Sequence, residues 1–320
     1  MPPHVSALTL ASSLLALLTL PAPSLSHSHL SHIIINGQLY HGFDPRPNQS
    51  NHPARVGWSS GAVDDGFVSP LNYSHADIIC HTAGASPRAH APVRAGDRIH
   101  VQWNGWPVGH VGPVLSYLAL CESADGSGCA GVDKTALRWT KVDDSAPALV
   151  PAPAQGAENG RVPGLGWATD VLIASNNSWQ VEVPRGLETG PYVLRHEIIA
   201  LHYAADRGGA QNYPLCINLW VEGQTGAGRF MLDDFDARDF YRIDDPGVLV
   251  NISAAMTRYV VPGPTVAAGA APVPHAEQRK SVLRAEGTPV VVLRGTTTAP
   301  FRTDATPTVT GRSGRFHRGR

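Results

Sequence analysis

Short runs of β-branched and aromatic residues recur along the chain, and several of them alternate with polar positions. In "RIHVQWN" the apolar residues Ile99, Val101 and Trp103 occupy every second position, and "SWQVEV" repeats the pattern. Such alternation places the apolar side chains on one face of a strand. The run "HIIING" ends in Asn36-Gly37, a pair typical of tight hairpin turns. The pattern therefore predicts short strands that each bury one face.

Two longer apolar runs, "PYVLRHEIIALH" and "LCINLWVEG", predict longer strands, and no stretch keeps a helical period. The chain is rich in turn formers, with 32 Gly and 27 Pro among 320 residues. These features favour an all-β protein, an antiparallel β-sandwich with long loops. The loops expected at 48–77 and 142–166 are long enough to carry function.

The first 26 residues predict a secretory signal peptide. The run "LTLASSLLALLTL" has the length of a signal-peptide core and is too short to cross a bilayer. Two prolines follow it, and "SLS" provides a small-x-small cleavage site, although no basic residue precedes the run. We therefore expect a secreted, extracellular protein whose mature chain begins at His27, and no later segment reads as a membrane span.

The cysteines and glycosylation sequons agree with export. Four cysteines, an even number, fit an oxidising compartment, but sequence alone allows three ways of pairing them. Asn-x-Ser sequons, candidate glycosylation sites, occur at Asn48, Asn72, Asn176 and Asn251.

Composition and charge change after residue 264. Residues 265–320 are Ala/Pro/Thr-rich, hold nine basic and three acidic residues and lack cysteine. We predict a disordered basic tail without a disulfide-stapled carbohydrate-binding module, following a catalytic domain at 27–264. The whole chain has a net charge of −1, so the domain is acidic, which argues against nucleic acid as its partner.

Cleavage after Ser26 would give His27 two metal-binding nitrogens, its free α-amine and its imidazole. The dense cluster around it also holds His29 and His32, but density alone does not make a ligand set. A third nitrogen is offered by His110, which precedes a Gly112-Pro113 turn. Three nitrogens in a plane suit copper, whereas zinc prefers a tetrahedron.

A second group of polar residues follows the strand-like run "RHEIIALH". It contains His202, Gln211 and Tyr213. Gln211 and Tyr213 are two positions apart, so on a strand they face the same side. A tyrosine there could approach a metal axially while the glutamine offers an amide beside it.

In this order the motifs resemble the fungal lytic polysaccharide monooxygenases of auxiliary activity family 9, formerly glycoside hydrolase family 61. The resemblance covers nearly all of 27–264. Its motifs are "DDGFVSPLNYSHADIICH", "AGDRIHVQW", "HVGPVLSYLALC", "VDKTAL", "WATDVLIASNNSW", "GPYVLRHEIIALHYA", "GAQNYPLC", "DPGVLVNI" and "YVVPGP".

The resemblance implies one Cu(2+) per chain, bound by His27 and His110 with Tyr213 axial, on a flat face of an immunoglobulin- or fibronectin-III-like sandwich. His202 and Gln211 would form a catalytic hydrogen-bonding pair beside the metal. It also implies disulfides Cys80–Cys216 and Cys121–Cys129.

The implied activity is oxidative cleavage of β-1,4-glucan, such as cellulose, by hydroxylation at C1 or C4. It requires an external electron donor, a small reductant or a redox protein, and O2 or H2O2, and we expect a monomer. Tyr259 in "RYVVPGP" matches the surface tyrosine that contacts substrate in the family.

Two alternatives remain open: a non-catalytic polysaccharide-binding sandwich, and a protein that stores or delivers copper. The set of His202, Gln211 and Tyr213 favours the enzyme, because a copper store has no need of groups arranged around an oxygen site.

Overall fold

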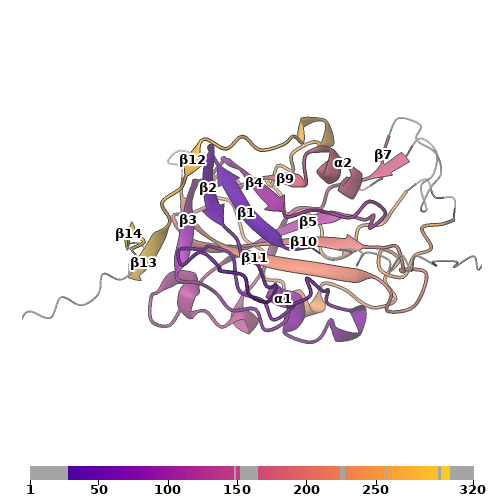
Figure 1. The fold of residues 1–320 in the computed structure, drawn as a ribbon, viewed down its shortest axis with the longest axis horizontal. Helices are drawn as coiled ribbons and strands as arrows, with labels where there is room; N and C mark the ends of the chain where they lie inside the picture. Colours follow the sequence, from indigo (N-terminus) through magenta and orange to yellow (C-terminus); the bar gives the residue numbers. More distant parts are fainter. Residues whose placement is uncertain are drawn as a thin grey trace, which may run out of the picture.

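Two β-sheets stacked face to face form the body of the protein (Figure 1). The computed structural model describes residues 28–147, 149–151, 165–223, 228–254, 256, 258–294 and 297–302. The prediction of an all-β sandwich with long loops is confirmed. The expected signal peptide, residues 1–26, and His27 lie outside the described residues.

The first sheet contains, in spatial order, β12 (Ala285–Glu286), β2 (Gln38–His41), β1 (Leu30–Ile35), β4 (Arg98–Trp103) and β9 (Ser178–Glu182). β1 and β2 form the expected hairpin, in which Ile35 lies opposite Gln38. Both turn residues have positive φ, 52° at Asn36 and 85° at Gly37, which is the conformation that Asn-Gly favours in two-residue hairpins.

The second sheet contains, in spatial order, β14 (Thr297–Pro300), β13 (Val290–Arg294), β3 (Ala89–Arg94), β11 (Gln211–Glu222), β10 (Gly190–Ala200), β5 (Val114–Leu120) and β6 (Thr140–Asp143). A separate hairpin pairs β7 (Leu149–Pro151) with β8 (Leu165–Trp167). The described α-helices are short, α1 (Asp77–Cys80) and α2 (Ala168–Ala174). The described 3-10 turns are Pro70–Asn72, Gly128–Gly131, Lys134–Ala136, Ala237–Asp239 and His275–Glu277. No helix in the described part of the chain is long and apolar enough to cross a membrane.

The main core lies between the two sheets. Ile33 and Val101 of the first sheet share one apolar cluster with Leu194 and Ile217 of the second. The alternation predicted for Arg98–Trp103 is confirmed, because its three apolar side chains all join this cluster. Burial of these alternating faces is the main force that holds the sheets together.

A second core covers the outer face of the second sheet. Val193 and Ile199 point away from the first sheet and pack in a cluster with Ile78 and Ile79 of α1. Every residue of β10 is therefore buried, although the strand contains charged residues. Two-sided burial explains why its sequence is an apolar run rather than a simple alternation.

A buried ion pair on β10 ties the second core to the sheet. Arg195 and Glu197 are both fully buried, with Nη1 2.7 Å from Oε2. The other guanidinium nitrogens of Arg195 donate to the carbonyls of Ile78 and Ile79 in α1, each at 2.9 Å. Glu197 also accepts from Nδ2 of Asn212 at 2.8 Å. Each charge thus has several partners, as a buried ion pair requires.

Both expected disulfides are present, Cys80–Cys216 and Cys121–Cys129. The first links α1 to β11 across the second core, and the second closes a local loop after β5. All four sequon asparagines have exposed side chains, so glycosylation there stays a prediction that the fold permits.

The prediction of disorder after residue 264 is wrong for the described residues up to 302. In Figure 1 this segment, in yellow, runs past β9 to β12 and then to β13. β12 pairs with β2, β13 pairs with β3, and Gln278 bonds the backbone of Gln180. Backbone pairing at sheet edges needs few apolar side chains, so composition did not reveal it. The expected disorder of 303–320 lies outside the described residues.

We predict that Glu197→Ala lowers the free energy of unfolding by about 3–5 kcal/mol, because it leaves the Arg195 charge buried without its carboxylate. Chemical denaturation followed by tryptophan fluorescence measures the change. As a control, Asp244→Ala breaks an exposed pair with Arg207, 2.9 Å apart, and should cost at most about 1 kcal/mol. Equal losses in the two variants would contradict the role of the buried pair.

Candidate metal centre

His110 lies on a tightly held loop between β4 and β5. Its backbone N–H donates to the carbonyl of Pro107 at 3.2 Å, and Nε1 of Trp106 donates to the His110 carbonyl at 2.8 Å. A Cβ at Gly112 would lie 1.9 Å from the Ile199 carbonyl oxygen, so only glycine allows this approach to β10. The glycine of the His-x-Gly-Pro motif thus brings the His110 loop against the end of β10.

The same contact brings His202 beside His110. The N–H of Leu201 donates to the carbonyl of Val111 at 2.9 Å, which aligns the two chain segments. The ring centroids of His110 and His202 are 3.9 Å apart with 39° between the planes. Two residues that are 92 positions apart and were both predicted as site residues therefore lie together.

Gln211 and Tyr213 complete this arrangement at the start of β11. The antiparallel ladder places Gln211 opposite Ala200, and Tyr213 opposite Ile198. The two side chains face the same side as predicted, since the Tyr213 hydroxyl donates to Oε1 of Gln211 at 3.0 Å. The edge of the Trp106 ring meets the Tyr213 ring at a centroid distance of 5.1 Å.

The side chains of Gln211 and Tyr213 are both buried. Tyr213 is fully buried and Gln211 is 7% exposed. Burial raises the pKa of Tyr213, and the carboxylates of Asp64 and Asp65 raise it further. The phenol is therefore neutral at physiological pH, and a neutral phenol oxygen is a weak metal ligand.

The histidines open onto a shallow surface depression of about 370 Å³. Its lining is Val108, Gly109, His110, His202, Tyr203, Ile252 and Ser253. No carboxylate or thiol belongs to this described lining. Imidazole nitrogens fit copper, whereas calcium or magnesium would require several carboxylate or carbonyl oxygens.

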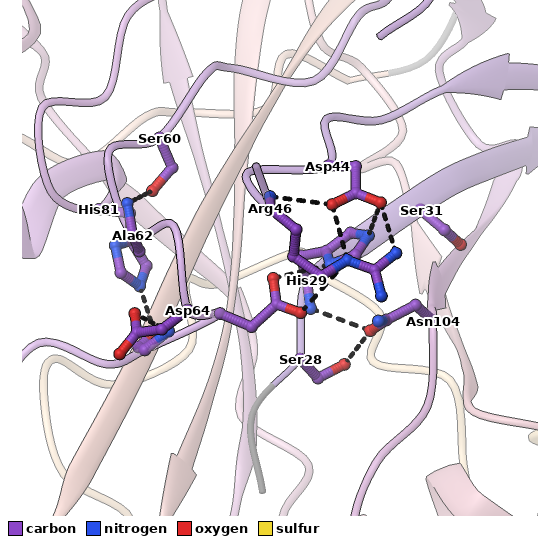
Figure 2. A network of polar contacts seen from close by, with 12 residues as sticks. Ser28, His29, Ser31, Asp44, Arg46, Ser60, Ala62, Asp64, His81 and Asn104 are labelled. Atoms are coloured by element: carbon purple, nitrogen blue, oxygen red, sulfur yellow. Dashed lines mark hydrogen bonds and ion pairs between the residues drawn. The ribbon is translucent and has the colours of Figure 1, made fainter. Parts of the chain in front are cut away.

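The first described residues of the chain are fastened to the loop that carries His110. Oγ of Ser28 and the N–H of His29 both donate to Oδ1 of Asn104, at 2.5 and 3.0 Å (Figure 2). The N–H of Asn104 returns a bond to the His29 carbonyl at 3.1 Å. Asn104 begins the segment that continues through Trp106 to His110. The residue before Ser28 is His27, so the predicted ligand is bonded directly to this anchored segment.

Comparison with known proteins decides the family. The profile of Auxiliary Activity family 9 (formerly GH61) matches residues 27–259. The chain belongs to this family. Its members are copper-dependent lytic polysaccharide monooxygenases, so the protein is an oxidoreductase that cleaves polysaccharide oxidatively.

Individual relatives agree with this assignment. The chain is 44% identical over 265 residues to AA9 family lytic polysaccharide monooxygenase A of Talaromyces verruculosus, covering 82% of this chain and 76% of the relative. It is 43% identical to AA9 family lytic polysaccharide monooxygenase cel61A of Hypocrea jecorina, and the match covers 81% of this chain and 71% of the relative. The solved extended catalytic domain of H. jecorina LPMO9A superposes with a TM-score of 0.70 at 43% identity, covering 82% of this chain and 98% of that one.

His29 belongs to a different network from the metal centre. Its Nδ1 lies 2.8 Å from Oδ1 of Asp65, and its Nε2 lies 3.7 Å from Oδ2 of Asp44. The guanidinium of Arg46 binds both oxygens of Asp44 (Figure 2). Its Nε also lies 3.9 Å from Oδ2 of Asp65. Although the three ligand atoms could surround an ion, Arg46 already supplies the positive charge. The network holds the N-terminal segment in place, and sequence reasoning missed it.

Other histidines have structural partners. His81 is buried with Nε2 2.9 Å from the Gly66 carbonyl, and burial lowers its pKa. His196 is fully buried against Ser116 and Trp103, and burial lowers its pKa to about 3. Both are neutral parts of the cores.

The predicted substrate residue Tyr259 does not line the depression. It is half-buried, its hydroxyl donates to the Gly247 carbonyl, and its ring meets Trp167 edge-on at 5.1 Å. Sequence reasoning missed Tyr203 instead, which is 61% exposed with its ring 4.4 Å from that of His202. The only sequence signal for a role of Tyr203 was its position directly after His202.

We predict that Asn104→Ala weakens copper binding roughly tenfold, because it removes both side-chain bonds that hold Ser28 and His29. Isothermal titration of the mature, metal-free protein measures the dissociation constant. Gln278→Ala is the matched control, since that amide also clamps a backbone, Gln180, in another region. An unchanged affinity in Asn104→Ala would show that this anchor does not position the ligand.

Proposed function

We propose that the protein is a secreted, monomeric enzyme that cleaves β-1,4-glucan, cellulose included, by hydroxylating C1 or C4 of the glycosidic linkage. It would use one Cu(2+), an external electron donor and O2 or H2O2. The observation that carries the proposal is the pair of His110 and His202, whose rings lie together and line one open depression. Gln211 and Tyr213 are bonded to each other on the adjoining end of β11.

His27, through its α-amine and imidazole, and His110 would hold the copper, and the Tyr213 phenol would be a further, weaker ligand. When bound, the copper would supply the one-electron chemistry that activates the oxygen co-substrate. Trp106 fixes the His110 backbone and packs on Tyr213, so the ligands are held by rigid neighbours.

The α-amine of His27 exists only after cleavage at Ser26. Mass spectrometry of the secreted protein should therefore find His27 as its first residue.

His202 and Gln211 would act on the oxygen co-substrate by hydrogen bonding. Gln211 already accepts from the Tyr213 hydroxyl through Oε1, which leaves its amide nitrogen as the donor. His202 stands against the His110 ring and faces the depression. Donors fixed in advance by the fold cost no reorganisation during the reaction.

The substrate surface would be the open face around this depression. Tyr203 and Val108 are both largely exposed at its rim, at 61% and 66%. An open rim suits a long chain better than a deep pocket does, and a tyrosine ring can stack on a sugar face. Tyr259, which is half-buried, stays a proposed contact.

The alternative of a binding protein without chemistry predicts no oxidised product. The test is incubation of the mature, copper-loaded protein with ascorbate and phosphoric-acid-swollen cellulose. Aldonic acids would report oxidation at C1, and 4-ketoaldoses would report oxidation at C4. Absence of both on several β-glucans would favour the binding alternative.

We predict that His110→Ala abolishes copper-dependent cleavage, because it removes a proposed ligand. Gln211→Ala should lower the rate about 10- to 1,000-fold while copper still binds, because it removes only a proposed donor to the co-substrate. Product release and copper affinity are measured on the same preparations. Normal cleavage by His110→Ala would end this interpretation of the site.

We predict that Tyr203→Ala weakens binding to cellulose about 2- to 10-fold, because it removes an exposed ring from the rim. Tyr203→Phe keeps the ring and should bind nearly as the wild type does. Pull-down isotherms on cellulose give the affinity, and copper titration checks that the metal centre is intact. Equal cellulose binding by all three proteins would remove Tyr203 from the substrate surface.

A further inference from the structure

Three possible metal ligands from separate segments meet at the edge of the first sheet. They are His41 at the end of β2, His52 in the following loop, and Glu286 in β12. Nε2 of His41 lies 3.1 Å from Oε1 of Glu286, and Nε2 of His52 lies 3.6 Å from the same oxygen. The two imidazole rings are stacked, with centroids 4.1 Å apart and 19° between planes.

We propose that His41, His52 and Glu286 form a second metal site, for zinc or a similar borderline divalent cation, that fastens the C-terminal segment to the catalytic body. It shares no residue with the proposed copper centre, and it does not depend on the proposed substrate.

Two of the three ligand-atom distances are close to those of a tetrahedral site. With metal–ligand bonds of about 2.0–2.1 Å, neighbouring ligand atoms of a tetrahedron lie about 3.3 Å apart. The two nitrogen–oxygen distances, 3.1 and 3.6 Å, bracket this value. Two histidines and one glutamate form a known catalytic-type zinc set that keeps one position for water. The side chains are 35%, 39% and 62% exposed, which leaves both an entry path and room for that water.

The backbone holds Glu286 in place for this role. Glu286 pairs with Leu39 in the parallel β12–β2 ladder. The N–H of Arg284 donates to the Gly37 carbonyl at 2.8 Å, and the N–H of Gly287 donates to the Leu39 carbonyl at 2.8 Å. β12 is only two residues long and both are exposed, so the pairing gains little from burial. A bound cation would therefore contribute directly to holding this segment.

The cluster of His41, His52 and Glu286 differs from the cluster around His29 in the charged residues that surround it. There Arg46 occupies the place of a cation, whereas in the described part of the chain Glu286 has ion pairs with only the two histidines. Metal binding has two costs. The stacked rings of His41 and His52 must turn, because each imidazole nitrogen binds a metal in the plane of its ring. In addition, Nδ1 of His52 accepts from the Ala54 N–H at 3.2 Å, so Nε2 carries the proton. Binding through Nε2 requires that this proton moves and that the Ala54 contact opens.

The first test measures stoichiometry on the full secreted protein with copper already loaded, since copper outcompetes zinc at nitrogen ligands. Equilibrium dialysis against Zn2+ should show one equivalent in addition to copper. The double variant His41→Ala/His52→Ala should lose it, with affinity at least tenfold weaker. His75→Ala is the control, because that exposed histidine pairs only with nearby Asp77 among the described residues. Co2+ in place of Zn2+ should give the intense visible bands of a tetrahedral site.

The second test examines whether bound zinc stabilises the attachment of the C-terminal segment to the first sheet. Hydrogen exchange of the Arg284 and Gly287 amides should slow when Zn2+ is added to the wild type, and should not change in Glu286→Gln. These side chains are partly exposed, so the variants should fold, and the copper-dependent activity verifies this. The proposal is overturned if the wild type and the double variant bind equal amounts of Zn2+, if no second equivalent binds, or if bound Zn2+ leaves the exchange unchanged.

Discussion

The register of the β10–β11 ladder is the constraint on which the candidate metal centre depends. It runs from Gly190 opposite Val221 to Ala200 opposite Gln211, and both faces of β10 are buried. A shift of one residue would exchange the side chains between the two cores and place Tyr213 on the wrong face. The pairing of Ile198 with Tyr213 is therefore enforced by the packing of the whole strand. Tyr213, the proposed ligand, therefore takes its position from the register of the whole ladder.

The metal centre lies where this ladder ends. Beyond Ala200 the chain leaves the sheet, and Leu201 bonds the loop that carries His110. The polar side chains thus stand at the boundary between a rigid, dry interior and the surface. The Arg195–Glu197 pair lies on the same strand and binds α1, so stability and site geometry share one element. Substitutions deep in β10 should for that reason affect copper binding as well as folding.

The sequence predicted what local periodicity and short spacing control. The alternating face of β4, the Asn-Gly hairpin and the shared face of Gln211 and Tyr213 all follow from a period of two. The pairing of the cysteines came from the family resemblance, since spacing left three options open. The anchor at Asn104 and the Asp44–Arg46–Asp65 network escaped prediction, because they join residues that only the folded chain brings together. Tyr203 escaped because exposure of a loop residue has no periodic signal.

The segment after residue 264 shows why composition failed there. Its described part is basic, yet none of its lysines or arginines forms an ion pair with the described body. Its two acids do: Glu277 binds Arg98 at 2.8 Å, and Glu286 meets His41 and His52. General attraction between a basic segment and an acidic domain therefore does not explain the docking. The segment is placed by main-chain bonds along the open edges of β2 and β3. Main-chain groups are the same in every residue, so this pairing leaves no trace in composition.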